Sequence, residues 1–177
     1  MDDRIVSMTR TLPDQTRRAL LASSAVFGLL ALARTPARAA DAEKAFDASP
    51  FRKLAPEDWR KRLPPASFHV MREEGTEYPF TSPLNNEHRK GVFVCLGCEL
   101  PLFKSDWKFD SHTGWPSFFR AIDGALGKKR DLSVGMERTE YHCARCLSHQ
   151  GHLFDDGPAP TGLRHCNNGV ALKFVPA

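Results

Sequence analysis

The side chains of this sequence best suited to chemistry are its five cysteines. Four form two Cys-x-x-Cys pairs, Cys95/Cys98 and Cys143/Cys146, whereas Cys166 stands alone. Two-residue spacing lets both sulfurs of a pair bind one ion, so two pairs can complete a tetrahedral site, for which Zn²⁺ is the natural occupant. Iron, two disulfides and two redox-active pairs are the alternatives. Strand-like residues before each pair favour a structural zinc, because a redox Cys-x-x-Cys usually opens a helix.

Cys166 is therefore the candidate nucleophile. Arg164 and Asn168 lie two residues to either side of it, so in a strand all three side chains would share a face. A cation at Arg164 would lower the thiol pKa. His149 and His152 come from a separate segment, where Gly151 between them would let both turn inward, and they form a candidate acid/base set. A buried, unreactive cysteine is the alternative.

Trp115 is the candidate wall of a binding pocket. Gly114 and Pro116 flank it and hold the aromatic ring at a turn. The indole could equally be an ordinary part of the core.

The elements that must position these residues are short. Proline and acidic residues predict helices over 56–63 and 67–74. Alternating apolar runs between turn signals predict strands over 91–94, 118–122, 132–137, 141–142 and 170–175. Many short strands without long helices between them favour a mostly β fold in which antiparallel sheets pack face to face.

Residues 1–39 are predicted to be an export signal. Arg17 and Arg18 precede an apolar run over 19–33, which is too short to span a membrane, and Ala37-Arg38-Ala39 is a suitable cleavage site. The paired arginines are typical of a twin-arginine signal, with an ordinary secretory signal as the alternative. Cleavage before Ala40 would leave no stable membrane anchor, and we expect an exported protein of the bacterial periplasm.

The rest of the chain is divided into a linker over 40–50 and one domain over 51–177. The net charge of the whole chain is +4, but the leader contributes three of these charges through six arginines against three aspartates. The mature part has no basic stripe, so we expect no nucleic-acid partner.

Five sequence blocks in the same order resemble the B class of methionine sulfoxide reductases. The resemblance runs from about residue 52 to the C-terminus, and its blocks are Pro79–Leu84, the two Cys-x-x-Cys pairs, Gly114–Phe118, Gly151–Phe154 with Asp156-Gly157-Pro158, and Gly162–Cys166. It implies two antiparallel sheets around the active site, a β-tent-like fold with short N-terminal helices, and a structural zinc site made of four cysteines.

The resemblance also implies the reaction and the residue roles. Cys166 would attack the sulfur of methionine-R-sulfoxide in oxidised proteins or peptides and become a sulfenic acid. Trp115 and Phe154 would hold the substrate methyl group, and Arg164 would assist the thiolate. His149, His152 and Asn168 would bind the sulfoxide oxygen. We expect a monomer that repairs oxidised proteins.

This chain departs from the family pattern at three places. Many members carry a second, resolving cysteine where this sequence has Thr113, so a thioredoxin-like protein or another external thiol is expected to regenerate Cys166. Asn167-Asn168-Gly169 replaces the usual hydrophobic residue, Asn and Ser, and should bend the strand early. His112 replaces a usual glycine.

Two other functions compete with the reductase. A cysteine hydrolase would pair Cys166 with His149 or His152, and a zinc-ribbon adaptor would only bind partners. The hydrolase predicts an acyl-enzyme, and the adaptor predicts that Cys166 is dispensable.

Overall fold

The structure, a computed structural model, describes residues 42–177. The strands in this part are β1 (Gly91–Cys95), β2 (Pro101–Lys104), β3 (Lys108–Phe109), β4 (Ser117–Phe118), β5 (Leu126–Asp131), β6 (Arg138–Cys143), β7 (His149–Phe154), β8 (Arg164–Asn167) and β9 (Leu172–Pro176). The α-helices α2 (Pro56–Arg62) and α3 (Pro65–Glu73) precede the strands. The described part also contains the 3₁₀ turns η1 (Pro50–Lys53), η2 (Pro83–Asn86), η3 (Ser105–Trp107) and η4 (Gly169–Ala171).

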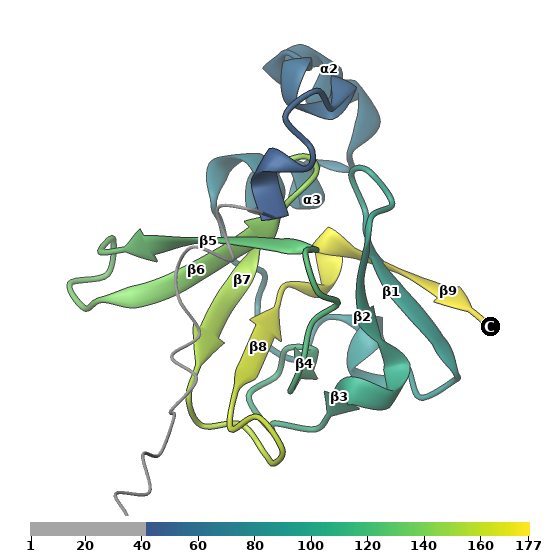
Figure 1. Ribbon diagram of the computed structural model, residues 1–177, viewed down its shortest axis with the longest axis vertical. Coiled ribbons are helices and arrows are strands. Elements are labelled where there is room, and N and C mark those ends of the chain that lie inside the picture. Colours follow the sequence, from purple (N-terminus) through teal and green to yellow (C-terminus); the bar gives the residue numbers. More distant parts are fainter. Residues whose placement is uncertain (1–41) are drawn as a thin grey trace, which may run out of the picture. The chain divides into compact units, whose positions relative to one another are not determined.

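The strands form two antiparallel sheets (Figure 1). One has three strands in the order β2-β1-β9, and the other has six in the order β3-β4-β8-β7-β6-β5. The mostly β fold with two antiparallel sheets that was expected from the sequence is confirmed.

Aromatic side chains join the two sheets. Phe118 of β4 stacks on Phe103 of β2 with ring centroids 4.2 Å apart, and it meets Phe93 of β1 edge-on at 5.0 Å. Tyr141 of β6 and His165 of β8 reach Phe103 from the same side. One face of the six-stranded sheet therefore forms the core with the three-stranded sheet, and its other face is free to carry a site.

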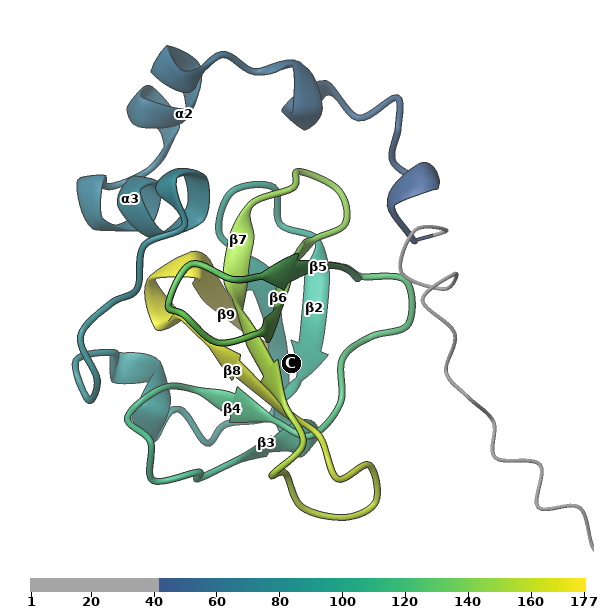
Figure 2. The same ribbon diagram turned by 90° about the vertical axis from the view of Figure 1, so that its left-hand side faces the viewer.

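The helices cover one end of the sheets (Figure 2). Each begins with proline at its first position, where no backbone N–H is needed. α3 ends at Glu74, which takes a left-handed conformation with φ 59°. Trp59 and Met71 are almost fully buried beside the first Cys-x-x-Cys turn, so the helices pack where the two sheets meet.

The structure corrects three strand boundaries. β4 is only Ser117–Phe118, because the chain then leaves the sheet and the Ile122 N–H donates to Leu102 of β2. Residues 132–137 are the turn of the β5–β6 hairpin, not a strand. Residues 170–171 belong to η4, so the last strand starts at Leu172.

The turn at 132–137 has a clear physical cause. The Asp131 carboxylate accepts from the Ser133 N–H at 2.8 Å, and Gly135 has φ 76°, which together reverse the chain. The alternating apolar residues Leu132, Val134 and Met136 are consequently exposed.

The described part of the predicted linker packs on the domain. The Glu43 carboxylate contacts the His142 imidazole at 3.1 Å, and Ala42 and Ser49 are buried. The predicted export signal, residues 1–39, lies outside the described residues. Within 42–177, no helix has the length and apolar character needed to cross a bilayer.

Candidate active site and metal centre

Cys166 lies in a row of polar side chains that crosses five strands of the six-stranded sheet. Its direct neighbours are Ser117 on β4 and His152 on β7. His152 in turn faces Glu140 on β6, which faces Lys129 on β5. Alternation places this row opposite the aromatic core residues. The site therefore lies on the face of the six-stranded sheet that is turned away from the three-stranded sheet.

A bulge in β7 brings both histidines to this face. Residues three apart on a regular strand point to opposite faces, but the pairing with β6 skips Gln150, so that Tyr141 faces Gly151 and His142 faces His149. The His149 and His152 rings lie 5.5 Å apart. The expected convergence of the two histidines is thus produced by the bulge.

Gly151 has a different role from the flexibility expected of it. A Cβ at this position would lie 1.9 Å from the Cys166 carbonyl oxygen. Glycine is required because β7 and the strand that carries Cys166 approach too closely for a side chain.

The two histidines have different partners. The His152 Nε2 lies 2.7 Å from Asp131, which also contacts Arg138 at 2.6 Å. The His149 Nδ1 lies 3.1 Å from the Glu140 carboxylate in an ion-pair contact, whereas the buried Nε2 has no hydrogen-bond partner. Because buried polar atoms are normally paired, a 2 % exposed imidazole with an unpartnered Nε2 suits a polar ligand atom.

The surroundings of Cys166 push its ionisation in opposing directions. Burial raises the pKa of the thiol above its usual value, while the charge of Arg164 and hydrogen bonds from Thr113 and Arg164 oppose this rise. The net pKa is raised, although Arg164 acts in the expected direction. Arg164 and Thr113 therefore do not make the resting thiol more acidic than usual, and the thiolate needs further stabilisation when substrate binds.

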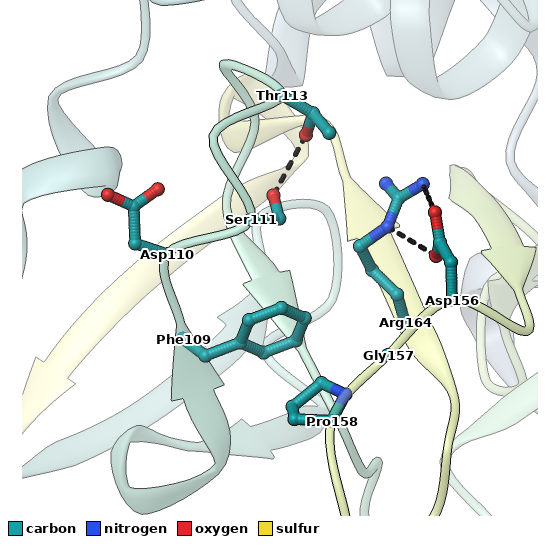
Figure 3. A pocket seen from close by; sticks show the side chains of 8 residues that line it. All are labelled: Phe109, Asp110, Ser111, Thr113, Asp156, Gly157, Pro158 and Arg164. Atoms are coloured by element: carbon teal, nitrogen blue, oxygen red, sulfur yellow. Dashed lines mark hydrogen bonds and ion pairs between the residues drawn. The ribbon is translucent and has the colours of Figure 1, made fainter.

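Arg164 is itself held in place. Its guanidinium makes two hydrogen bonds to Asp156, at 2.8 and 2.9 Å (Figure 3). It also lies 4.2 Å from the centre of the Phe154 ring. Arg164 and Phe154 are direct cross-strand partners. Phe154 thus lies on the Cys166 face, as its expected role requires.

The loop before β4 covers one side of Cys166. The Trp115 indole N–H donates to the Glu77 carbonyl at 3.1 Å, which fixes the half-buried ring. The Thr113 hydroxyl bonds to Ser111, and this loop and the β7–β8 loop enclose a surface hollow of about 350 Å³ (Figure 3). The rest of its lining is Phe109, Asp110, Asp156, Gly157, Pro158 and Arg164.

The residues after Cys166 turn away from the strand, as the Asn-Gly pair predicted. β8 ends at Asn167, and η4 begins at Gly169. Both ends of the Asn168 side chain are used: the Glu77 N–H donates to it at 3.0 Å, and it donates to the Gln150 carbonyl at 3.0 Å. Asn168 therefore joins three segments around the site.

Two other departures have local explanations. Asn167 points to the core face, where it accepts from the Tyr141 hydroxyl at 2.9 Å. His112 has φ 57°, a left-handed conformation that glycine adopts without strain, and its exposed ring lies 3.3 Å from Asp110.

The four paired cysteines converge on one buried point. Their sulfur atoms all lie within 4.8 Å of one another, with Cys95–Cys146 at 3.6 Å and Cys98–Cys143 at 3.5 Å. A zinc tetrahedron with bonds of about 2.3 Å has sulfur–sulfur edges of about 3.8 Å. The cluster could therefore hold a metal ion of that size.

The two Cys-x-x-Cys turns are built alike. Glu99 and Leu147, which follow the second cysteine of each pair, both have φ 59° and donate their N–H groups to Cys95 and Cys143. The hydrogen bond between Cys143 and Cys146 raises the pKa of the first thiol and lowers that of the second. A cation would let all four ionise together.

Arginine side chains surround both turns. Each donates to a backbone carbonyl of a turn at 2.7–3.1 Å, and the pairs are Arg62 with Gly97, Arg145 with Cys98, Arg52 with Ala144, and Arg72 with Cys146. Four positive groups beside four thiolates reduce the cost of concentrating negative charge there.

Gln150 connects the cysteine cluster to the active site. Its amide donates to the Cys95 sulfur at 3.6 Å, while its backbone carbonyl accepts from Asn168. The bulge that orients the histidines is therefore also anchored to the cluster.

The chain is similar to known proteins over most of its described length. The SelR domain model matches residues 63–176, which include the four-cysteine cluster and the whole Cys166 row. The chain belongs to the SelR family. A protein of Agrobacterium fabrum named peptide methionine sulfoxide reductase MsrB is 52 % identical over 120 residues, covering 67 % of this chain and 89 % of the relative. A Pseudomonas putida protein of the same name is 54 % identical over 121 residues, covering 68 % and 91 %.

Among solved structures, the Mis18 'Yippee-like' domain matches with a TM-score of 0.41 and 16 % identity, covering 50 % of this chain and 98 % of that one.

The SelR match begins at residue 63, after the segment that supplies Arg52, Trp59 and Arg62 to the cysteine turns. This chain therefore supports its SelR domain with residues that precede the matched region.

Sequence reasoning missed Asp131 and Glu140, the carboxylates beside the histidines. Glu140 is 3 % exposed, which is unusual for a carboxylate without a role. Glu140 lies two residues after Arg138, so both side chains share one face of a strand, and this spacing was the available signal. It was missed because a strand was predicted over 132–137, which left residues 138–140 outside any strand.

Proposed function

We propose that this protein reduces peptide-bound methionine-R-sulfoxide to methionine and thereby repairs oxidised proteins. The observation that carries the proposal is the cross-strand pairing of Cys166 with His152, beside the unpartnered Nε2 of His149. Membership of the SelR family, with relatives that bear the reductase name, supports it.

The first step transfers the sulfoxide oxygen to Cys166. The thiolate attacks the substrate sulfur, and the oxygen takes up one proton and passes as a hydroxyl group to the Cys166 sulfur as its bond to the substrate sulfur breaks. The thioether leaves, and Cys166 becomes a sulfenic acid. His149 and His152 bind the oxygen and supply the proton. Asn168 fixes the backbone beside them, and Arg164 favours the thiolate.

Trp115 and Phe154 form the proposed cradle for the substrate methyl group. Both rings are held by a polar anchor, the Glu77 carbonyl in one case and the Arg164 guanidinium in the other. A dry aromatic wall that accepts the methyl group leaves one arrangement for sulfur and oxygen, which selects the R epimer.

Zn²⁺ is the proposed occupant of Cys95, Cys98, Cys143 and Cys146. The buried positions, the sulfur–sulfur spacing and the twin turns fit a tetrahedral thiolate site. Zinc there would supply no catalytic chemistry, because four sulfurs leave it no open position.

An external thiol completes the proposed cycle. With four cysteines committed to the metal, Cys166 has no thiol partner among residues 42–177. A thioredoxin-like protein or a small thiol would attack the sulfenic acid, release water, and leave a mixed disulfide that a second thiol resolves. We expect a monomeric enzyme with no nucleic-acid partner.

The proposed site of action is the bacterial periplasm, reached by twin-arginine export and cleavage before Ala40. The Arg17-Arg18 pair and the apolar run after it support this assignment. Cell fractionation of the native chain and of an Arg17-Arg18→Lys-Lys variant tests it: the variant should stay in the cytoplasm, and equal export of both contradicts the twin-arginine route.

The function is tested with the separated sulfoxide epimers of a methionyl peptide. The protein should reduce the R epimer, with either thioredoxin or a small thiol as reductant, and leave the S epimer unchanged. Cys166→Ser should abolish turnover while zinc content stays the same. Ester hydrolysis with an acyl-enzyme, or full activity of the Cys166→Ser variant, would exclude the reductase.

A further inference from the structure

Asp131 ends β5 with a carboxylate whose side chain is only 12 % exposed. Its Oδ1 accepts from the Ser133 N–H, and its Oδ2 meets both the His152 Nε2, at 2.7 Å, and the Arg138 guanidinium, at 2.6 Å. The hydrogen bonds from Ser133, followed by the one from His152, hold the pKa of Asp131 well below its usual range. The group is therefore an anion at neutral pH.

An anionic carboxylate can only accept hydrogen bonds, so the His152 Nε2 must carry the proton in this contact. That leaves Nδ1 as the ring nitrogen available to a substrate. His152 is the direct cross-strand neighbour of Cys166, so its Nδ1 lies on the strand position beside the reacting sulfur.

We propose that Asp131 is a positioning residue for sulfoxide reduction, which fixes His152 with its Nε2–H on the carboxylate so that Nδ1 of the doubly protonated ring delivers its proton to the sulfoxide oxygen. The inference rests on the proposed function. The proton balances the step: thiolate, sulfoxide and one proton give sulfenic acid and thioether. Asp131 touches neither sulfur and acts through His152.

Charges of both signs face His152 from the neighbouring strands. They are Asp131 on β5, Arg138 and Glu140 on β6, His149 on β7 and Cys166 on β8. Burial lowers the pKa of His152 most, Asp131 opposes that shift, and Arg138 and His149 add to it. Asp131 and Arg138 thus act on one imidazole in opposite directions.

This opposition separates positioning from simple support of the hairpin. Asp131→Asn and Arg138→Gln both remove the same ion pair, so a purely structural role predicts similar effects. A positioning role predicts opposite shifts of the His152 titration, because one variant removes an anion and the other a cation. Glu137→Gln, which removes an exposed pair with Arg130 on the same hairpin, is the matched control.

The experiment measures methionine formed in a single turnover, without reductant, against pH. In Asp131→Asn, the alkaline-side midpoint, above which His152 has lost the proton it delivers, should move down by about one pH unit, and the neutral rate should fall about tenfold. In Arg138→Gln the midpoint should move up, and in Glu137→Gln it should not move. Midpoints that stay fixed, or that move in the same direction, overturn the inference.

A second measurement does not depend on catalysis or on the variants folding. Nitrogen-15 NMR of the native protein should show His152 with its proton on Nε2, and the opposite tautomer overturns the inference. If the native protein forms no methionine from the R epimer, the proposed function fails. If it turns over but the tautomer or the shifts are wrong, only the role of Asp131 fails.

Discussion

The thiol at Cys166 is not permanently ionised, because its pKa is raised above the usual value. Burial raises its pKa, and the positive charge of Arg164 and the Thr113 hydroxyl only partly offset this. A thiol that stays largely protonated at rest is also less exposed to adventitious oxidation, because the thiolate is the reactive form. Thr113 therefore matters twice, as a hydrogen-bond donor to the sulfur and as the position where the family resemblance led us to expect a resolving thiol.

Thr113→Cys should restore an internal resolving step. Because the Thr113 side chain already reaches Cys166, an introduced thiol would attack the sulfenic acid, release water and form a disulfide with Cys166. Mass spectrometry after one turnover without reductant should find this disulfide in the variant and a sulfenic acid in the native protein.

Thr113→Ser is the control, because it keeps the hydroxyl and adds no thiol. It should retain the sulfenic acid after turnover. A variant thiol that remains free while Cys166 is oxidised would show that the two side chains are too far apart to react.

At the scale of elements, the sequence predicted the chemistry better than the geometry. The two Cys-x-x-Cys pairs and Cys166 could be identified because each depends on residue type and short spacing. The bulge at Gln150 could not, since it is defined by pairing with β6. The β5–β6 turn was missed because Leu132, Val134 and Met136 alternate like a strand while the Asp131 side chain and Gly135 reverse the chain.

The helix α2 is expected to slow metal loss, although it lies before the matched family region. Arg62 at its end donates to the Gly97 carbonyl between the first pair of cysteines, at 2.8 Å. Arg62→Ala should increase the rate of zinc release to a chelator several-fold, because it removes a positive charge and a backbone anchor beside the thiolates. A colorimetric chelator measures the release directly.

Lys61→Ala is the matched control on the same helix. It removes one positive charge from an exposed position, so its zinc release should stay at the native rate. Equal acceleration in both variants would indicate a general charge effect, and no acceleration in either would contradict the anchoring role of Arg62.

At the scale of the whole domain, the cysteine cluster fastens the two sheets together. Cys95 ends β1 of the three-stranded sheet, and Cys143 ends β6 of the six-stranded sheet. A metal bound there would therefore add a strong link to the aromatic contacts of Phe103 and Phe118. Gln150 connects this link to the bulge that orients His149 and His152, so loss of the metal should disturb the active site at a distance.

Removal of the metal should lower both stability and activity. Cys98→Ser, or chelation of the native protein, should reduce the free energy of unfolding by several kcal/mol and the Tm by about 10 °C or more, because metal-binding free energy contributes to folding. Calorimetry with zinc analysis measures the effect. Cys166→Ser removes a thiol outside the cluster, so it should keep the zinc and the native Tm. The difference in Tm between these two cysteine variants is the decisive result. If the cluster served only as reduced, metal-free packing, Cys98→Ser would lower the Tm almost as little as Cys166→Ser.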